Sequence, residues 1–269
     1  MKLLFSEHKS DYDHYVFPYA VWAVPESGES AADLFDAGFL PSSRHLDRFY
    51  LCRQVRVDLR QFKPSSENRR ILRKGDGIQV KLVSRRRFRY TQERRAFCKG
   101  YADIKFGKDT MSFERLDNLF NSALITHVLV YTDTATGAEI GLAMVYCEAR
   151  ALAFYYYGFY DLNYFQRNLG MFMMTSAVSL FAGRSMRHMY LGSCYSTNAL
   201  YKTQFTGAEF FNGFRWSQNL KELKQLLERD TAGAKQHTLE SEEFLRLFYG
   251  GDIRQVTDLS RFQIKLPRA

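Results

Sequence analysis

The apolar and polar positions of the first hundred residues predict short helices and strands in alternation. Residues 30–36 favour a short helix that ends at Gly38, and residues 49–62 favour extended chain with an apolar side. Serines at 65 and 66 followed by Glu67 predict a capped helix that ends at Gly75. Residues 79–84 then alternate as a half-buried strand does.

After Ala123 the pattern becomes longer and more apolar. Residues 124–131 and 139–147 predict two strands of a hairpin, and the aromatic run at 151–160 predicts a third, central strand. Residues 171–183 are apolar on all sides and follow a glycine turn, which favours a buried helix, and 189–192 favour a strand. Further helices are expected at 113–120, 200–205, 216–228 and 241–249.

The order strand, strand, strand, helix, strand is that of N-acyltransferases with the acetyltransferase-like (GNAT) fold. Amides at the start of such a helix can receive an anion or a polarised carbonyl, while a gap beside the central strand admits an amine. The predicted class is therefore α+β: a mixed sheet flanked by helices in a catalytic domain at residues 76–269 with C-terminal helices. A smaller, basic α/β domain is expected at residues 1–75.

The start of the predicted buried helix matches the coenzyme A signature of acetyltransferases only in part. Arg167-Asn168-Leu169-Gly170-Met171-Phe172 begins as RxxGxG/A does, but Phe172 stands where a small residue is usual. A bulky side chain where backbone must approach phosphate argues against ordinary coenzyme A binding.

Composition indicates a folded chain with a large core. The 269 residues are 46% apolar and 16% aromatic. The longest mostly apolar stretch, residues 171–183, is shorter than the roughly 18 to 20 residues that cross a bilayer, and no apolar segment of signal length follows Lys2. We expect a cytoplasmic protein that has no membrane partner.

The basic charge is concentrated in less than a quarter of the chain. The whole chain has a net charge of +9. Residues 44–105 hold 19 basic and six acidic side chains. Clustered guanidinium groups suit phosphate recognition, and Phe88, Tyr90 and Phe97 among them offer faces on which bases stack. A solvated basic surface is the commoner origin of such a run. The candidate nucleic-acid-binding residues are Arg69, Arg70, Arg73, Arg85, Arg86 and Arg87.

Cysteine and histidine spacing gives no local support for a metal centre. The four cysteines lie more than forty residues apart, and no histidine stands in an HExxH or HxE arrangement. Buried, inert thiols are the expected role of such scattered cysteines. We predict no metal site.

Two separated blocks of sequence carry a family resemblance. The later block holds Tyr157-Gly158-Phe159-Tyr160-Asp161, Leu169-Gly170, Tyr190-Leu191-Gly192 and Tyr201-Lys202, then Phe205, Glu209 and Trp216. The earlier block holds Gly38-Phe39, Arg56-Val57, Phe62-Lys63-Pro64-Ser65 and Asn68-Arg69-Arg70-Ile71-Leu72. In this order they resemble the arginyl-tRNA-protein transferases and their bacterial leucyl-transferring relatives, over residues 17 to about 230.

The chain departs from that family at three places. The family's N-terminal cysteine cluster is reduced to Cys52, so no metal-linked regulation is expected. Leu162 replaces the proline after the Tyr-Asp pair, and the segment from Cys194 to Asn198 replaces a cysteine-proline turn. Because that loop is expected to border the site, the resemblance does not determine which N-terminal residue accepts the amino acid.

The resemblance implies transfer of an amino acid from aminoacyl-tRNA to the α-amine at the N-terminus of a protein or peptide. The partners would be tRNA and that N-terminus, with aminoacyl-tRNA as co-substrate and no other cofactor. An aminoacyl ester is already activated, so positioning and oxyanion stabilisation supply most of the acceleration.

The same resemblance suggests roles for particular residues. Asp161 would orient the acceptor amine or the aminoacyl group, with Tyr160 as its hydrogen-bonding partner. Amides near Leu169 and Gly170 would face the ester, and Tyr201 with Lys202 would contact the tRNA end. The remaining substrate-binding candidates are Tyr157, Tyr190 and Gly192. Core aromatics, turn glycines and a surface lysine are the structural alternatives for these positions.

Two other functions fit the same pattern. An acyl-coenzyme A N-acyltransferase would use the helix start but would not need the basic region. A non-catalytic tRNA or RNA binder on the same scaffold would need the basic region alone, and steep salt dependence without transfer would identify it.

Overall fold

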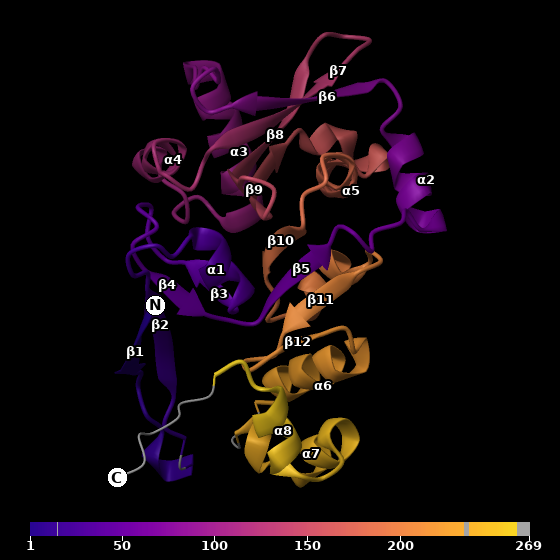
Figure 1. Ribbon diagram of the computed structural model, residues 1–269. Helices are drawn as coiled ribbons and strands as arrows, with labels where there is room; N and C mark the ends of the chain where they lie inside the picture. The colour runs from indigo at the N-terminus through magenta and orange to yellow at the C-terminus, as the bar shows by residue number, and fades with distance from the viewer. Residues whose placement is uncertain (15, 234–236, 263–269) are drawn as a thin grey trace.

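The computed structural model describes residues 1–14, 16–233 and 237–262, which form two β-sheets and the helices around them (Figure 1). The smaller sheet has the strand order β1-β2-β4-β3 and the larger one β12-β11-β5-β10-β9-β8-β7-β6. The strands of the smaller sheet are β1 (Lys2–Glu7), β2 (Tyr19–Val24), β3 (Phe39–Pro41) and β4 (Phe49–Leu51). Those of the larger sheet are β5 (Gln54–Asp58), β6 (Ile78–Ser84), β7 (His127–Asp133), β8 (Glu139–Glu148), β9 (Leu152–Tyr160), β10 (His188–Ser193), β11 (Ala208–Phe211) and β12 (Trp216–Ser217).

Helices cover both faces of the larger sheet. On one face α3 and α4 enclose a core that includes Cys98, Leu116 and Phe159, and on the other α2 and α5 enclose a core that includes Ile71 and Met173. The helices are α1 (Ala31–Asp36), α2 (Ser66–Lys74), α3 (Gln92–Phe106), α4 (Phe113–Phe120), α5 (Leu169–Gly183), α6 (Leu220–Thr231), α7 (Glu242–Tyr249) and α8 (Ile253–Leu259). The predicted α+β class, a mixed sheet flanked by helices, is confirmed.

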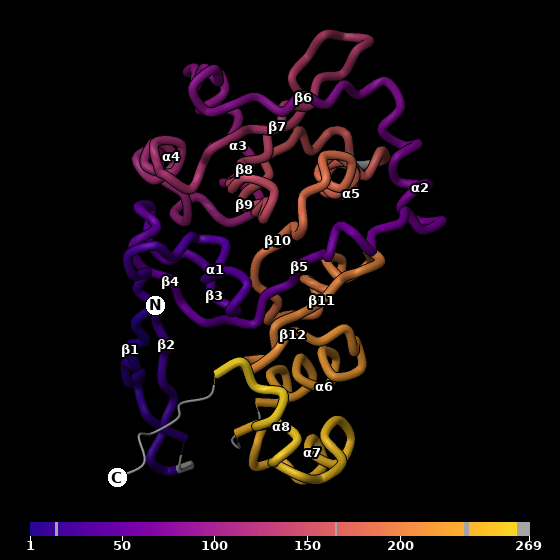
Figure 2. Tube along the Cα trace, in the orientation of Figure 1, coloured from indigo at the N-terminus to yellow at the C-terminus, as the bar shows by residue number. Residues whose placement is uncertain are grey.

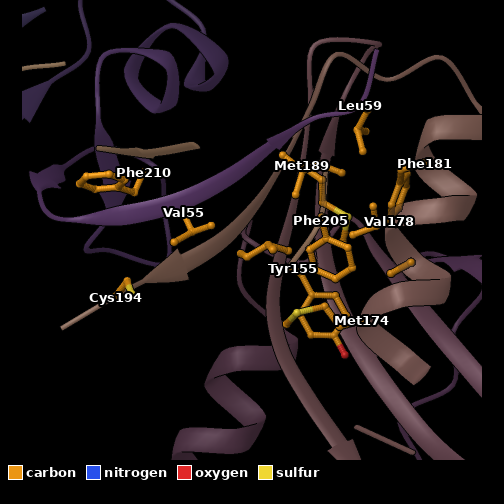
Figure 3. Packing of buried hydrophobic residues seen from close by; sticks show 14 of the residues in the cluster. Val55, Leu59, Tyr155, Met174, Val178, Phe181, Met189, Cys194, Phe205 and Phe210 are labelled. Atoms are coloured by element: carbon orange, nitrogen blue, oxygen red, sulfur yellow. The ribbon is translucent and has the colours of Figure 1, made fainter. Parts of the chain in front are cut away.

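The central strand leaves its neighbour part-way along its length. Strands β6 to β9 pair antiparallel, whereas β10 runs parallel to β9 and pairs with it only from His188 to Tyr190. Beyond Phe154 the two strands diverge, and Tyr155, Met174 and Phe205 pack between β9, β10 and α5 (Figure 3). The gap predicted beside the central strand is therefore present.

Local sequence signals account for most helix starts. Ser30, Ser65, Ser112 and Ser241 each accept a backbone N–H of the following turn, as N-cap residues do. The apolar helix α5 is 15 residues long. Within residues 1–14, 16–233 and 237–262, no helix combines the length and apolar character that a membrane span requires.

Several elements differ from the predictions. Residues 92–106 form α3, where no helix was predicted and Phe97 was expected as a stacking face; the helix is capped by Thr91 and buries Cys98 and Ala102. The helix expected from residue 216 begins only at Leu220, because Trp216 and Ser217 pair with β11. The hairpin of β1 and β2 had no counterpart in the sequence pattern.

The large sheet draws on both sides of the predicted domain boundary at residue 75. Strand β5 lies between β10 and β11, antiparallel to both, and buries Val55 and Val57 completely. The tube in Figure 2 shows α2 beside α5. The division into residues 1–75 and 76–269 stays a prediction, and residues 263–269 lie outside the described part of the chain.

Candidate functional site

A cleft of about 540 Å³ opens where β9 and β10 diverge. It is enclosed by the end of α3, the second half of β9, the start of α5 and the short 3-10 helix η3 (Thr197–Thr203). Six predicted residues line it together: Tyr157, Tyr160, Leu169, Gly170, Tyr201 and Lys202. Residues 44 positions apart in sequence thus share one cavity, as the resemblance implied.

The start of α5 presents backbone amides to this cleft. Asn168 adopts a left-handed conformation (φ 51°) and makes no side-chain cap, and the first α-helical bond runs from the Phe172 amide to the Asn168 carbonyl at 2.9 Å. In the described part of the chain no hydrogen bond reaches the amides of Gly170 and Met171. Unpaired amides at a helix start attract a negative oxygen.

Gly170 is required because an aromatic ring lies against the helix start. A Cβ at this position would lie 2.8 Å from the Tyr160 ring and its hydroxyl oxygen. The missing side chain lets the Tyr160 ring cover the first turn of α5, so that its hydroxyl stands beside the unpaired amides. Glycine here reflects a close approach, not only a turn.

Lys202 contributes the half-buried cation of the cleft. Its Nζ donates to the carbonyl oxygen of Ser193 at 2.7 Å, and burial lowers the pKa of its ammonium group. That carbonyl follows Gly192 (φ 85°), at which the register between β10 and β5 shifts. Gly192 does not line the cleft; it shapes the bulge that holds Lys202 in place.

The tyrosine hydroxyls of the cleft are neutral donors. Burial, together with a hydrogen bond to Tyr160, raises the pKa of Tyr101, and burial also raises the pKa of Tyr201. The rings of Tyr101 and Tyr160 lie 4.8 Å apart between centroids. A neutral phenol can donate to a developing oxyanion without adding negative charge.

Besides Gly192, two predicted catalytic or substrate-binding residues lie outside the cleft lining. Asp161 directs its Oδ1 to the backbone N–H of Asn163 at 2.9 Å, which stabilises the turn after β9. Tyr190 is buried, and its hydroxyl accepts from Nη1 of Arg56 at 3.3 Å. The catalytic role of Asp161 stays a prediction, while the geometry gives Tyr190 a place in the scaffold.

Several residues that carried the family resemblance form one buried cluster. Arg56 on β5 pairs with Glu209 at 2.8 Å and with Asp36 at 2.6 Å. Its guanidinium carbon lies 3.8 Å from the ring centroid of Trp216. This cluster joins α1 of the N-terminal region to the large sheet, so its members have a structural role away from the cleft.

The partial coenzyme A signature fails for a different reason than the sequence suggested. Phe172 does not face the cleft: its ring fills the space above Gly75 and contacts Tyr131. Arg167 is the residue turned away, because its side chain donates to the carbonyls of Lys74 (3.2 Å) and Asp76 at the end of α2. The guanidinium that would hold a pyrophosphate is thus engaged with backbone.

None of the six predicted nucleic-acid-binding arginines lines the cleft. Arg69 donates to the Pro64 carbonyl and Arg70 pairs with Glu67, while Arg73 is exposed on α2. Arg85 donates to the Phe120 carbonyl at 2.7 Å.

The second arginine group and the cleft lie on different strands of the sheet. Arg85, Arg86 and Arg87 follow Ser84, the last residue of β6. The cleft is lined by β9, which is separated from β6 by β7 and β8. The structure therefore does not bring the arginine groups together around the site.

The sequence reasoning missed the wall that α3 provides. Tyr101, Lys105 and Phe106 line the cleft from the last turns of this helix. The spacing of Phe97, Tyr101 and Lys105 at every fourth residue was the available signal, and it was hidden among the arginines. Among the described residues, no group of three or more histidine, cysteine, aspartate or glutamate side chains is placed to hold a metal ion.

Comparisons with known proteins find distant relatives. No protein-family model matches the chain. It is 25% identical over 172 residues to an aspartate/glutamate leucyltransferase of Ruegeria sp. (strain TM1040), and 24% over 171 residues to that of Ruegeria pomeroyi. The matched region covers 62% and 61% of this chain, respectively, and 61% of each relative.

The chain is also similar to several solved structures, of which three are described. One is FemX, with 10% identity and a TM-score of 0.42, covering 65% of this chain and 63% of that one. Another is L-PGS of Bacillus licheniformis, with 12% identity and a TM-score of 0.38, covering 66% of this chain and 56% of that one. The third is a GCN5-related N-acetyltransferase of Sphaerobacter thermophilus, with 13% identity and a TM-score of 0.37, covering 65% of this chain and 50% of that one.

Proposed function

We propose that this protein is an aminoacyl-tRNA-protein transferase. The α-amine of an acceptor N-terminus attacks the ester carbonyl of aminoacyl-tRNA, and the bond from that carbonyl to the ribose oxygen breaks. The amine proton passes to the ribose oxygen, so the products are a peptide bond and a tRNA with a free terminal hydroxyl. Similarity to two leucyltransferases supports this assignment.

The observation that carries the proposal is the cleft that opens at the start of α5. The amides of Gly170 and Met171 and the hydroxyl of Tyr160 would stabilise the oxyanion that forms on the ester carbonyl. Lys202 adds positive charge from the opposite wall, where the Ser193 carbonyl holds it. We assign Tyr157 and Tyr201 to the walls that position the two substrates.

The lining also favours particular substrates. Leu169, Met171, Met174 and Leu191 give the cleft an apolar side that suits an apolar donor side chain. Lys105 and Lys202 give it positive charge that suits an acidic acceptor residue. This combination agrees with the activity for which the two relatives are named, leucyl transfer to aspartate or glutamate.

Acyl-coenzyme A is a less suitable donor for this cleft. Arg167 is the arginine that begins the pyrophosphate signature. It donates from Nε to the Lys74 carbonyl and from Nη2 to the Asp76 carbonyl. A charged donor with two phosphates would then meet the helix start without its usual guanidinium partner. A single-stranded tRNA end needs no such partner at this position.

The test is a transfer assay that crosses donors with acceptors. Labelled aminoacyl-tRNAs and labelled acetyl-coenzyme A are offered in parallel to peptides that differ only in their first residue. We expect label from leucyl-tRNA, or another tRNA with an apolar amino acid, to enter peptides that begin with aspartate or glutamate. Transfer from acetyl-coenzyme A alone would disprove the proposal, as would tRNA binding without any transfer.

A further inference from the structure

A second pocket adjoins the cleft and shares a wall with it. It has a volume of about 160 Å³ and is formed by the loop between β3 and β4, by α4 and by β9. Tyr156 and Tyr157 line both cavities. Their rings meet edge to face, with centroids 4.6 Å apart, so the two tyrosines form the partition.

The pocket carries two guanidinium groups and no acidic lining residue. Arg44 comes from the loop after β3 and Arg115 from α4, and both are exposed. Burial raises the pKa of Tyr156 to about 12, while the charge of Arg115 acts in the opposite direction. The positive charge of Arg115 therefore reaches the partition itself.

Three side chains that line the pocket carry N–H groups for which the described residues provide no acceptor. Arg44 uses Nη1 for Asn118 Oδ1 at 2.6 Å and Nε for His45, which leaves Nη2. Arg115 uses Nη1 for the Thr110 carbonyl at 2.9 Å, which leaves Nη2 and Nε. The side-chain amide nitrogen of Asn118 also makes no hydrogen bond there.

The pocket is held in shape by contacts outside it. The Arg44 carbonyl accepts the Ala123 amide at 2.9 Å, which ties the loop after β3 to the segment between α4 and β7. The hydroxyl of Ser42 bonds the Arg48 carbonyl at 3.1 Å, which closes the loop upon itself. The backbone of the loop that carries Arg44 is thus held in place before a ligand arrives.

We propose that this pocket binds the phosphodiester on the 5′ side of the terminal adenosine of aminoacyl-tRNA. The inference rests on the proposed function and adds the subsite that fixes the tRNA end. Two arginine forks and an amide suit the oxygens of a phosphate, and the partition offers tyrosine rings for a terminal base. The ribose separates this phosphate from the ester, as the partition separates the pocket from the cleft.

An acidic acceptor side chain is the competing occupant. Its carboxylate is attached to the same residue as the reacting amine, so it has to be bound inside the cleft, where Lys105 and Lys202 lie. The pocket beyond the partition is better placed for a group that the donor carries on the far side of its sugar. The observations therefore favour RNA over the peptide.

The experiment uses two minimal donors that differ by one phosphodiester. Leucyl-adenosine lacks the phosphate and leucyl-cytidylyl-adenosine contains it. We expect wild-type protein to use the second donor with the lower KM. Arg115→Gln should raise KM for that donor about tenfold and leave leucyl-adenosine unchanged, because a charge-assisted pair to phosphate is lost. Arg115→Lys keeps the positive charge, so its KM for leucyl-cytidylyl-adenosine should lie between those of wild type and Arg115→Gln.

Arg246→Gln is the matched control, because Arg246 is an exposed arginine of α7 that lines neither cavity. Circular dichroism and thermal midpoints establish that each variant is folded. An equal rise of KM for both donors would overturn the proposal. So would a rise of KM only for acceptor peptides that begin with aspartate, which would assign the pocket to the peptide.

Binding of uncharged cytidylyl-adenosine, measured by calorimetry, separates this inference from the proposed function. A Kd weakened about tenfold by Arg115→Gln but not by Arg246→Gln supports the pocket even where no amino acid is transferred. Transfer by wild-type protein with identical dinucleotide affinity in all variants would retain the function and refute the pocket.

Discussion

Lys202 shows how one residue combines a structural and a chemical role. Its ammonium group is held by the Ser193 carbonyl, which the bulge at Gly192 presents, and it faces a cleft of neutral tyrosines. A partly buried cation that has one backbone acceptor keeps two N–H groups for a substrate oxygen. The sequence pattern identified the residue, and the fold supplies its partner.

Removing the charge of Lys202 tests that role. We expect Lys202→Met to reduce kcat for transfer by roughly 100-fold, because one preorganised donor to the oxyanion is lost. As pH rises through the lowered pKa of Lys202, wild-type kcat should fall, since the ammonium loses its charge. Lys81→Met, at an exposed position of β6, is the control in steady-state kinetics. Unchanged kcat in Lys202→Met would contradict the assignment.

A substitution of Asp161 distinguishes a structural role in the turn from a catalytic role. The carboxylate accepts the Asn163 amide, and the side chain of asparagine provides the same acceptor oxygen. We therefore expect Asp161→Asn to transfer within about threefold of wild type, as substitutions that keep a turn contact do. Single-turnover rates measure this. A loss of several hundredfold with an unchanged thermal midpoint would restore the catalytic role that the sequence suggested.

His188 makes stability depend on pH. Burial, and then the charge of Arg56, lower its pKa to about 4 from a usual value near 6.5. Between these two pH values the unfolded chain therefore binds the proton of His188 more tightly than the folded chain does. The contribution of neutral His188 to stability is fully present above pH 6.5 and is lost as pH falls through 4. The free energy of unfolding should decrease by at most about 3 kcal/mol over this range. Urea titrations of wild type and His188→Gln at several pH values measure the difference, and parallel curves would contradict it.

At the scale of elements, the position of α5 depends on its contact with the end of α2. Phe172 lies against Gly75, where no side chain fits: a Cβ there would come within 1.9 Å of the ring. Arg167 reinforces the contact through the carbonyls of Lys74 and Asp76. The helix start that faces the cleft is thus set by a helix from the other side of the sequence-based domain boundary.

Gly75→Ala tests this contact without backbone strain, because Gly75 has a negative φ of −89°. We expect a loss of about 1 to 3 kcal/mol in the free energy of unfolding, as overpacked sites show, and a reduced kcat. Gly100→Ala is the control, since its Cβ in α3 meets open space and should stabilise the helix by about 0.5 to 1 kcal/mol. Equal stability of the two variants would show that α5 does not depend on this packing.

Across the whole molecule, the Arg56 cluster joins the two sheets. Arg56 connects Asp36 at the end of α1 with Glu209 on β11, and Asp36 also pairs with Arg261. The indole N–H of Trp216 donates to the Asp36 carbonyl at 2.8 Å. Helix α1, strand β5 and the segment after α8 therefore meet at the carboxylate of Asp36. Figure 1 shows α1 beside the small sheet.

Removing this arginine should loosen the molecule as a whole. We expect Arg56→Met to cost about 3 to 5 kcal/mol, because the carboxylate of Glu209 is left in the interior without its partner. Arg73→Met, an exposed arginine of α2, should stay within about 0.5 kcal/mol of wild type. Denaturant midpoints with limited proteolysis of residues 1–51 measure both. A native-like midpoint in Arg56→Met would show that the sheets are joined by apolar contacts instead.

The sequence by itself determined the local elements and the class of the fold. Serine caps, glycine ends and apolar periodicity act over a few residues, so they predicted α1, α2, α4 and α5 and the strands from β6 to β10. They failed at α3, where arginines that pair with Glu139 and Asp117 conceal the apolar face. The resemblance placed Tyr160, Gly170 and Lys202 in one site, and the structure brings them to one cleft.

Only the tertiary structure decided which charges surround that cleft. Charge counts predicted an arginine-rich surface, but backbone carbonyls and carboxylates engage Arg69, Arg70 and Arg85, and none of them reaches the cavity. Arg44 and Arg115, 71 positions apart, meet in the pocket beside it. Sequence patterns record short-range order, whereas the divergence of β9 from β10 and the packing of α4 arise from contacts between distant segments.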